Sequence, residues 1–142
     1  MDDVWKVGRA ILEADLAARQ LGIELVDIKP GYARMTMAIK PDMANGHGIG
    51  HGGMTFSLAD TAMAYASNSR NHRAVAQSVL VNFLRPTHPG DLLTATAEEV
   101  NRTRSTGVYD VTVTNQKGER VAVFRGTTHT IKGEHVPGLH IT

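Results

Sequence analysis

The segment NGHGIGHGGMTFSLADTAMAYASNS, residues 45–69, joins a glycine-rich loop to a helix that is apolar on several sides. The loop, residues 41–53, has no apolar period, whereas small and apolar side chains recur around the following 17 positions. A helix with this pattern buries more than one face and is surrounded by protein rather than by water. We therefore predict a buried helix over about residues 53–69.

Helical and strand-like patterns lie on both sides of this helix. An apolar repeat at helical spacing predicts one N-terminal helix over residues 4–21, and residues 133–142 have little pattern and are expected to be irregular. Strand-like segments are residues 23–29 and 32–40 before the buried helix, and residues 74–84, 92–100, 106–114 and 120–131 after it; short turns separate the segments within each group. Successive strands joined by short turns indicate an antiparallel sheet, and hence an α+β domain.

The composition excludes several classes of protein. Because the chain has no cysteine, a disulfide scaffold, a thiol nucleophile and a Cys-ligated metal centre are excluded. The net charge is only +1, without the basic excess of nucleic-acid-binding domains. No apolar run approaches the roughly 20 residues of a membrane helix, and the N-terminus lacks a secretory apolar core. We expect one cytoplasmic domain, residues 1–142, that acts on a small molecule.

Asp60 lies inside the apolar helix, next to Leu58, Ala59, Ala62 and Met63. Aspartate is a poor residue for a helix interior, and a buried carboxylate without partners is costly. Two interpretations follow from the residues alone. Either the charge is structural and paired, or it performs chemistry.

Gly52 and Gly53 lie where the loop enters the helix. The first N–H groups of a helix have no partner within the helix and carry partial positive charge, so they can polarise a carbonyl group. A turn without function is the other interpretation of such glycines. Gly52 and Asp60 are eight positions apart, about 12 Å along a helix, so both cannot serve one carbonyl within one subunit. If both are catalytic, antiparallel helices of two subunits must share each site.

The segment quoted above resembles the signature of the PaaI-type hotdog thioesterases. Its HGG-x5-AD core, residues 51–60, is followed by FLRPTHPGDLLTATA, residues 83–97, which resembles the strand–turn–strand of that family. The resemblance covers about residues 5–132. It implies a hotdog fold: a long central helix wrapped by a curved antiparallel sheet of five to six strands, with the N-terminal helix alongside. It also implies a homodimer with shared sites, usually assembled into a homotetramer, and hydrolysis of an acyl-CoA without metal or other cofactor.

The resemblance also assigns roles to individual residues. Asp60 would be the nucleophile or the general base, and the Gly52 N–H would polarise the thioester carbonyl from across the dimer interface, with Gly53 beside it. Asn45 would orient the thioester or the attacking water, and His51 would support the loop.

Further residues are candidates for contacts with the substrate. A CoA carries several phosphate charges, for which Arg85, or the pair Arg102 and Arg104, are the candidates. Met63 and Phe83 are among the candidate linings of the acyl pocket. The acyl group expected from the family is phenylacetyl, hydroxyphenylacetyl or a similar aryl or medium-chain group.

Two alternative functions remain open, whereas a metal site is disfavoured. A hotdog enoyl-CoA hydratase or dehydratase would use an Asp/His pair, and here His51 is nine positions from Asp60. A non-catalytic acyl-CoA binding module would not depend on Asp60. A metal site is disfavoured, because His47 and His51, although four positions apart, lie in a loop rather than on a helix.

Overall fold

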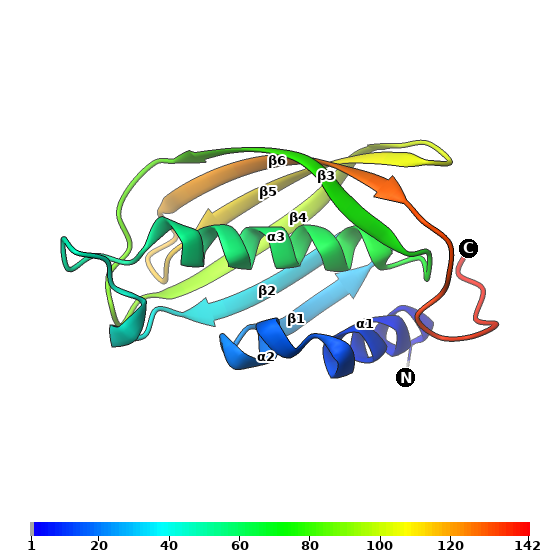
Figure 1. The fold of residues 1–142 in the computed structure, drawn as a ribbon, viewed down its shortest axis with the longest axis horizontal. Coiled ribbons are helices and arrows are strands. Elements are labelled where there is room, and N and C mark those ends of the chain that lie inside the picture. The colour runs from blue at the N-terminus through cyan, green and yellow to red at the C-terminus, as the bar shows by residue number, and fades with distance from the viewer. Residues whose placement is uncertain (1) are drawn as a thin grey trace.

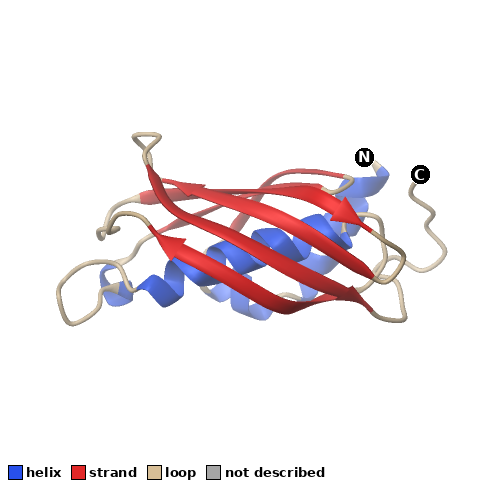
Figure 2. Cartoon of the chain, turned by 90° about the horizontal axis from the view of Figure 1, so that it is seen from above, coloured by secondary structure: helices blue, strands red, loops and turns tan. Residues whose placement is uncertain are grey.

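The computed structural model describes residues 2–142 and places one long helix, α3 (Gly52–Asn68), inside a curved six-stranded sheet (Figures 1 and 2). All the strands pair antiparallel, in the order β1-β2-β4-β5-β6-β3. The strands are β1 (Glu24–Lys29), β2 (Tyr32–Ala38), β3 (Ala74–Phe83), β4 (Leu92–Arg102), β5 (Thr106–Thr114) and β6 (Arg120–Thr130). The α+β class, the central helix and the antiparallel sheet are therefore confirmed.

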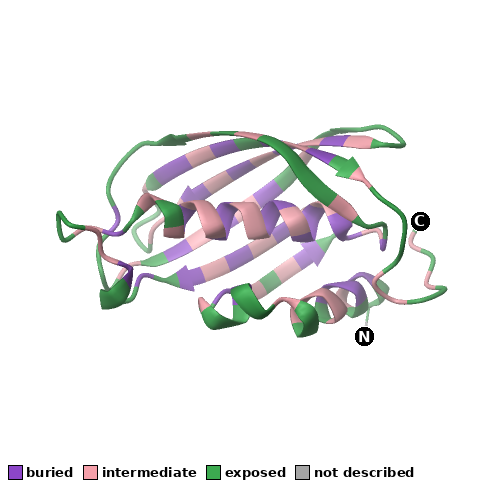
Figure 3. Cartoon of the chain, in the orientation of Figure 1, coloured by how far each residue is buried: buried purple, intermediate pink, exposed green. Residues whose placement is uncertain are grey.

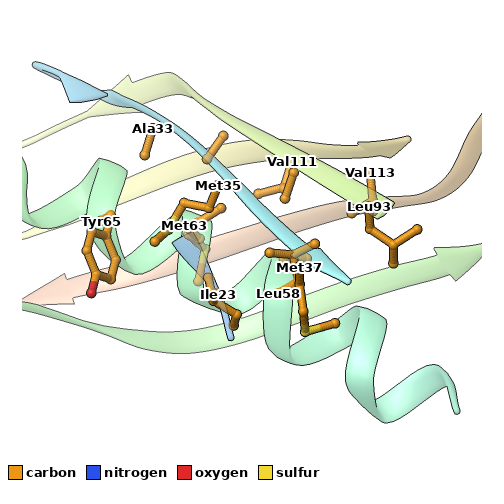
Figure 4. Close-up of a cluster of buried hydrophobic side chains, with 14 of the residues drawn as sticks. Ile23, Ala33, Met35, Met37, Leu58, Met63, Tyr65, Leu93, Val111 and Val113 are labelled. Atoms are coloured by element: carbon orange, nitrogen blue, oxygen red, sulfur yellow. The ribbon is translucent and has the colours of Figure 1, made fainter. Parts of the chain in front are cut away.

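The core lies between α3 and the face of the sheet that it covers (Figure 4). Alternate residues of β2 are buried, as a half-covered strand requires, and Met35 and Met37 are at most 1% exposed. From α3, Leu58, Met63 and Tyr65 point into the same cluster and are also at most 1% exposed. The opposite stripe of α3 is only partly covered within this chain.

The N-terminal helix is divided in two, which corrects the prediction of one helix over residues 4–21. Helix α1 (Asp3–Ala14) ends at Asp15, and a short α2 (Leu16–Gln20) begins there. The Asp15 side chain accepts a hydrogen bond from the Ala18 N–H at 3.1 Å and another from the Tyr65 hydroxyl at 3.2 Å. Capping therefore competes successfully with helix continuation at this residue. Both helices lie beside β1 (Figure 1).

Strand β3 is an edge of the sheet and is largely exposed (Figure 3). Val75 and Leu80 on this strand are 48% and 68% exposed, and Phe83 and Leu84 at its end are 55% and 52% exposed. An exposed apolar edge strand has free backbone groups that a second chain can pair with.

The C-terminal residues 133–142 form no helix or strand, as predicted, but they are held in place by Asn71. This residue has a left-handed backbone, φ 70°, and is 1% exposed. Its side-chain amide donates to the carbonyls of Val136 and Leu139, and its oxygen accepts from the N–H groups of His135 and Val136. No helix of the described chain is long and apolar enough to cross a membrane.

Candidate active site

The loop before α3 is folded back on itself by backbone hydrogen bonds. Its ends meet where the His51 N–H donates to the Met43 carbonyl at 2.8 Å, after a 3-10 turn, η1 (Pro41–Met43). Within the loop, the Asn45 N–H donates to the Ile49 carbonyl at 2.7 Å. Gly50 is bonded to the β3–β4 connection, through its N–H and the Thr87 carbonyl, also at 2.7 Å. These bonds fix the direction in which the chain enters α3.

His51 caps the N-terminus of α3, and this separates the two predicted glycine donors. Its Nδ1 accepts a hydrogen bond from the Gly53 N–H at 2.9 Å. Among the described residues, the Gly52 N–H has no acceptor. Gly52 is therefore the donor that remains free for a ligand, whereas the Gly53 N–H, also predicted for the site, is occupied by the cap.

Four of the predicted site residues meet at one cleft of about 470 Å³: Asn45, Gly52, Phe83 and Arg85. The Asn45 side-chain oxygen accepts from the His47 N–H at 2.9 Å, which leaves its amide N–H₂ group as the free donor. The Phe83 ring packs on Gly52, where an added Cβ would lie 3.2 Å from the ring. Arg85 is held by Glu119 at 2.8 Å and is exposed at the rim.

Asp60 lies away from this cleft, about two turns further along α3. It is half-buried, and its side chain forms no hydrogen bond or ion pair within residues 2–142. Burial raises the pKa of the Asp60 carboxyl above its ordinary value. The carboxylate is therefore not a paired structural charge in this chain. The separation from Gly52, about 12 Å along the helix, remains as the sequence predicted.

Arg102 and Arg104 line a second pocket, at the other end of α3. This pocket, of about 330 Å³, also contains Arg70 and His72, together with the hydroxyl groups of Ser67, Thr106, Tyr109, Thr128 and Thr130. Two of these arginines lie near the Glu99 carboxylate, which pairs with Arg70 at 2.7 Å and lies 3.7 Å from Arg102. Arg104 forms no ion pair with any described residue. Basic side chains and hydroxyls in this arrangement are suited to phosphate groups.

Met63 is placed in the core rather than in a pocket. Its side chain is 1% exposed and packs against Gly126 of β6. The reason is its helical phase, because position 63 lies on the stripe of α3 that faces the sheet. As for metals, residues 2–142 contain no group of three or more His, Cys, Asp or Glu side chains that could hold an ion.

The fold and the site can now be compared with known proteins. The family model of the thioesterase superfamily matches residues 47–122, more than half of the chain. The matched region contains the second half of the glycine-rich loop, α3 and the strands up to the start of β6. The chain therefore belongs to the thioesterase superfamily.

Individual relatives are more specific. The acyl-coenzyme A thioesterase PaaI of Escherichia coli is 46% identical over 129 residues, covering 91% of this chain and 92% of the relative. The solved structure of the E. coli PaaI protein has a TM-score of 0.91 at 45% identity, covering 93% of this chain and 96% of that one. A mutant PaaI of Thermus thermophilus has a TM-score of 0.78 at 37% identity, covering 81% and 98%. The predicted hotdog fold and the predicted class, a PaaI-type acyl-CoA thioesterase, are confirmed.

Proposed function

We propose that the chain hydrolyses aryl or medium-chain acyl-CoA thioesters at sites shared between two copies, each site combining Asp60 of one copy with Gly52 of the other. One observation carries the proposal. A half-buried carboxylate without a partner and a helix N–H without an acceptor lie on the same helix, eight positions apart. Within one chain these two groups are too far apart to act on the same carbonyl. Two antiparallel helices place Asp60 of each copy near Gly52 of the other and so form two sites.

The chemistry requires only these groups and water. The Gly52 N–H donates to the thioester oxygen, on which negative charge develops during attack. Asp60 either attacks the carbonyl carbon, so that the C–S bond breaks and a mixed anhydride is left for water, or it takes the proton of an attacking water. Both routes give the free acid and CoA thiol. Neither needs a metal or an organic cofactor.

The exposed edge of the sheet supports the pairing of two copies. β3 has unpaired backbone groups and exposes Val75, Leu80, Phe83 and Leu84. Phe83 also packs on Gly52, so a surface that a second copy covers is continuous with the proposed site. A dimer formed there, and a tetramer of such dimers, would bury apolar groups that are exposed in one chain.

The pocket lined by Arg102 and Arg104 is the proposed binding site for the phosphate groups of CoA. Ser67, which lines it, is seven positions after Asp60 on α3, about 10 Å along the helix. Ala64 lies between them on the same partly exposed stripe. A substrate whose thioester is at Asp60 can therefore extend its phosphates along this stripe toward Arg102 and Arg104.

An aryl-acetyl group is the acyl portion that we propose. The E. coli relatives, an acyl-CoA thioesterase and a protein of a phenylacetic acid degradation operon, favour it. Within this chain, the half-exposed ring of Phe83 beside Gly52 offers an aromatic surface next to the carbonyl position.

The first experiment measures CoA release from a panel of acyl-CoAs with a thiol-reactive chromophore, to which a protein without cysteine gives no background. Asp60→Asn should lower kcat by about 10²-fold or more while the protein stays folded. Asp42→Asn, which removes one exposed carboxylate from the loop before α3, is the matched control and should retain activity. Binding of every acyl-CoA without CoA release would instead favour a binding module, and hydration of an enoyl-CoA would favour a hydratase.

A second experiment tests the shared site by mixing two inactive variants. Gly52→Pro deletes the free N–H at the first helical position, where proline is well tolerated, and His51 already has the extended backbone that a following proline prefers. A mixed dimer of Gly52→Pro with Asp60→Asn contains one intact site of two. Random exchange forms mixed pairs in half of the dimers, so about one quarter of wild-type activity should return. No recovery on mixing would place both groups of each site in one subunit.

A further inference from the structure

Gly50 and Thr87 make an unusually close contact beside the proposed site. A Cβ added at Gly50 would overlap Thr87 Oγ1, and it would lie 3.2 Å from Thr87 Cβ and 3.4 Å from Ile39 Cγ2. The Gly50 N–H also donates to the Thr87 carbonyl at 2.7 Å. Gly50 does not have a positive φ, so the space available, rather than backbone conformation, is what requires glycine at this position.

Thr87 is itself unusual in its burial. It is 4% exposed, and its Oγ1 is the one buried side-chain nitrogen or oxygen without a hydrogen-bond partner in residues 2–142. A buried hydroxyl without a partner is unfavourable. The Thr87 side chain therefore fills space against Gly50 and does not contribute a hydrogen bond.

The contact lies between the two segments that form the cleft. Gly50 is two residues before Gly52, and Thr87 is two residues after Arg85 in the β3–β4 connection. All four residues line the same cleft. On the other side of the loop, the His51 N–H is bonded to the Met43 carbonyl. The chain entering α3 is thus held between two fixed contacts, one of which is the Gly50–Thr87 pair.

We propose that Gly50 and Thr87 are a size-matched pair of positioning residues that set the place of the Gly52 N–H relative to the thioester carbonyl. The proposal rests on the proposed function, in which that N–H is the oxyanion donor. An extra methyl group at Gly50 forces the loop and the β3–β4 connection apart. A catalytic donor must be held within about 0.5 Å of its productive position, and a displacement of about 1 Å can reduce the rate by about 10²-fold.

The test is a pair of single variants and their combination. Gly50→Ala overfills the contact and should lower kcat by about 10- to 100-fold with a much smaller change in KM. Thr87→Gly underfills it, frees the loop, and should lower kcat by a smaller factor of about 3 to 10. The double variant exchanges the two sizes, because the new methyl group occupies the space of the lost side chain. Its kcat should return to within about threefold of wild type.

Thermal stability separates positioning from general damage. Gly8→Ala is the matched control, because its added Cβ would lie 2.8 Å from Leu25 Cδ2 between α1 and β1, away from the cleft. It should lower the melting temperature and leave kcat unchanged. If Gly50→Ala does not fold, the comparison of the double variant with Thr87→Gly alone carries the test. A double variant that is no faster than Thr87→Gly overturns the pairing, as does a Gly50→Ala enzyme with wild-type kcat.

Failure of the proposed function has a different outcome in the same assay. It would be seen as absence of CoA release by the wild type, or as full activity of Asp60→Asn. A wild type that is active and depends on Asp60, combined with independent effects of the changes at Gly50 and Thr87, overturns only the size-matched pair.

Discussion

Replacement of Asn71 should release the C-terminal tail from the end of α3. The side chain uses all four of its hydrogen-bonding positions, with distances of 2.8 Å to the Val136 and Leu139 carbonyls and 2.9 Å to the N–H groups of His135 and Val136. At about 1 kcal/mol for each buried hydrogen bond, Asn71→Ala removes about 4 kcal/mol of tail docking. Alanine in a left-handed conformation costs about 1 kcal/mol more. Asn71→Gly should lose the hydrogen bonds without that strain.

Hydrogen exchange measures this loss where it occurs. The amides of His135 and Val136 donate directly to Asn71, and a loss of about 4 kcal/mol corresponds to about a thousandfold faster exchange if the tail opens locally. Global unfolding should be affected less than exchange in the tail, because residues 133–142 can detach while the sheet remains folded. The difference between the alanine and glycine variants isolates the backbone strain. Exchange at His135 and Val136 within about tenfold of wild type in Asn71→Ala would refute the reasoning.

Two further predictions concern the proposed site. Burial raises the pKa of Asp60, so as the pH falls the carboxylate should become protonated, and activity should be lost, at a higher pH than for an exposed aspartate. A kcat/KM profile whose acidic limb lies at the ordinary value near 3.8 would contradict this. Arg104→Gln should raise KM for acyl-CoAs by about 3- to 10-fold and leave KM unchanged for N-acetylcysteamine thioesters, which lack phosphates; equal effects on both substrates would remove Arg104 from the phosphate site.

The elements whose patterns are local could be predicted from the sequence. The segment 106–114 was expected as a strand and forms β5 with those bounds, and the apolar helix was expected within one residue of α3. The N-terminal helix was also expected, but its division at Asp15 was not, because the apolar period continues through this residue. What ends α1 is the Asp15 side chain, which caps α2 and bonds to Tyr65, 50 positions away. A contact of that range has no signal in a single sequence.

The same distinction holds for the site. Asp60 could be proposed as a candidate because a charge interrupts an apolar helix, and Gly52 because glycines precede that helix. The different states of the Gly52 and Gly53 N–H groups depend on the direction of one side chain, His51. The contact between Gly50 and Thr87 joins residues 37 positions apart. A glycine that is needed because a distant side chain fills the space beside it cannot be recognised from a single sequence, in which that side chain is not known.

The distance between the two groups on α3 also has a chemical consequence for the proposed mechanism. If Asp60 could reach the N-terminus of its own helix, the N–H groups there would stabilise its charge and lower its basicity. The donor would then be occupied by the carboxylate and not available to the substrate. Two turns of helix prevent this, and burial among apolar residues instead raises the pKa of Asp60 toward the range in which a carboxylate is an effective base. In the proposed dimer, the thioester carbonyl lies between Asp60 of one copy and Gly52 of the other, so each group meets the substrate rather than its counterpart.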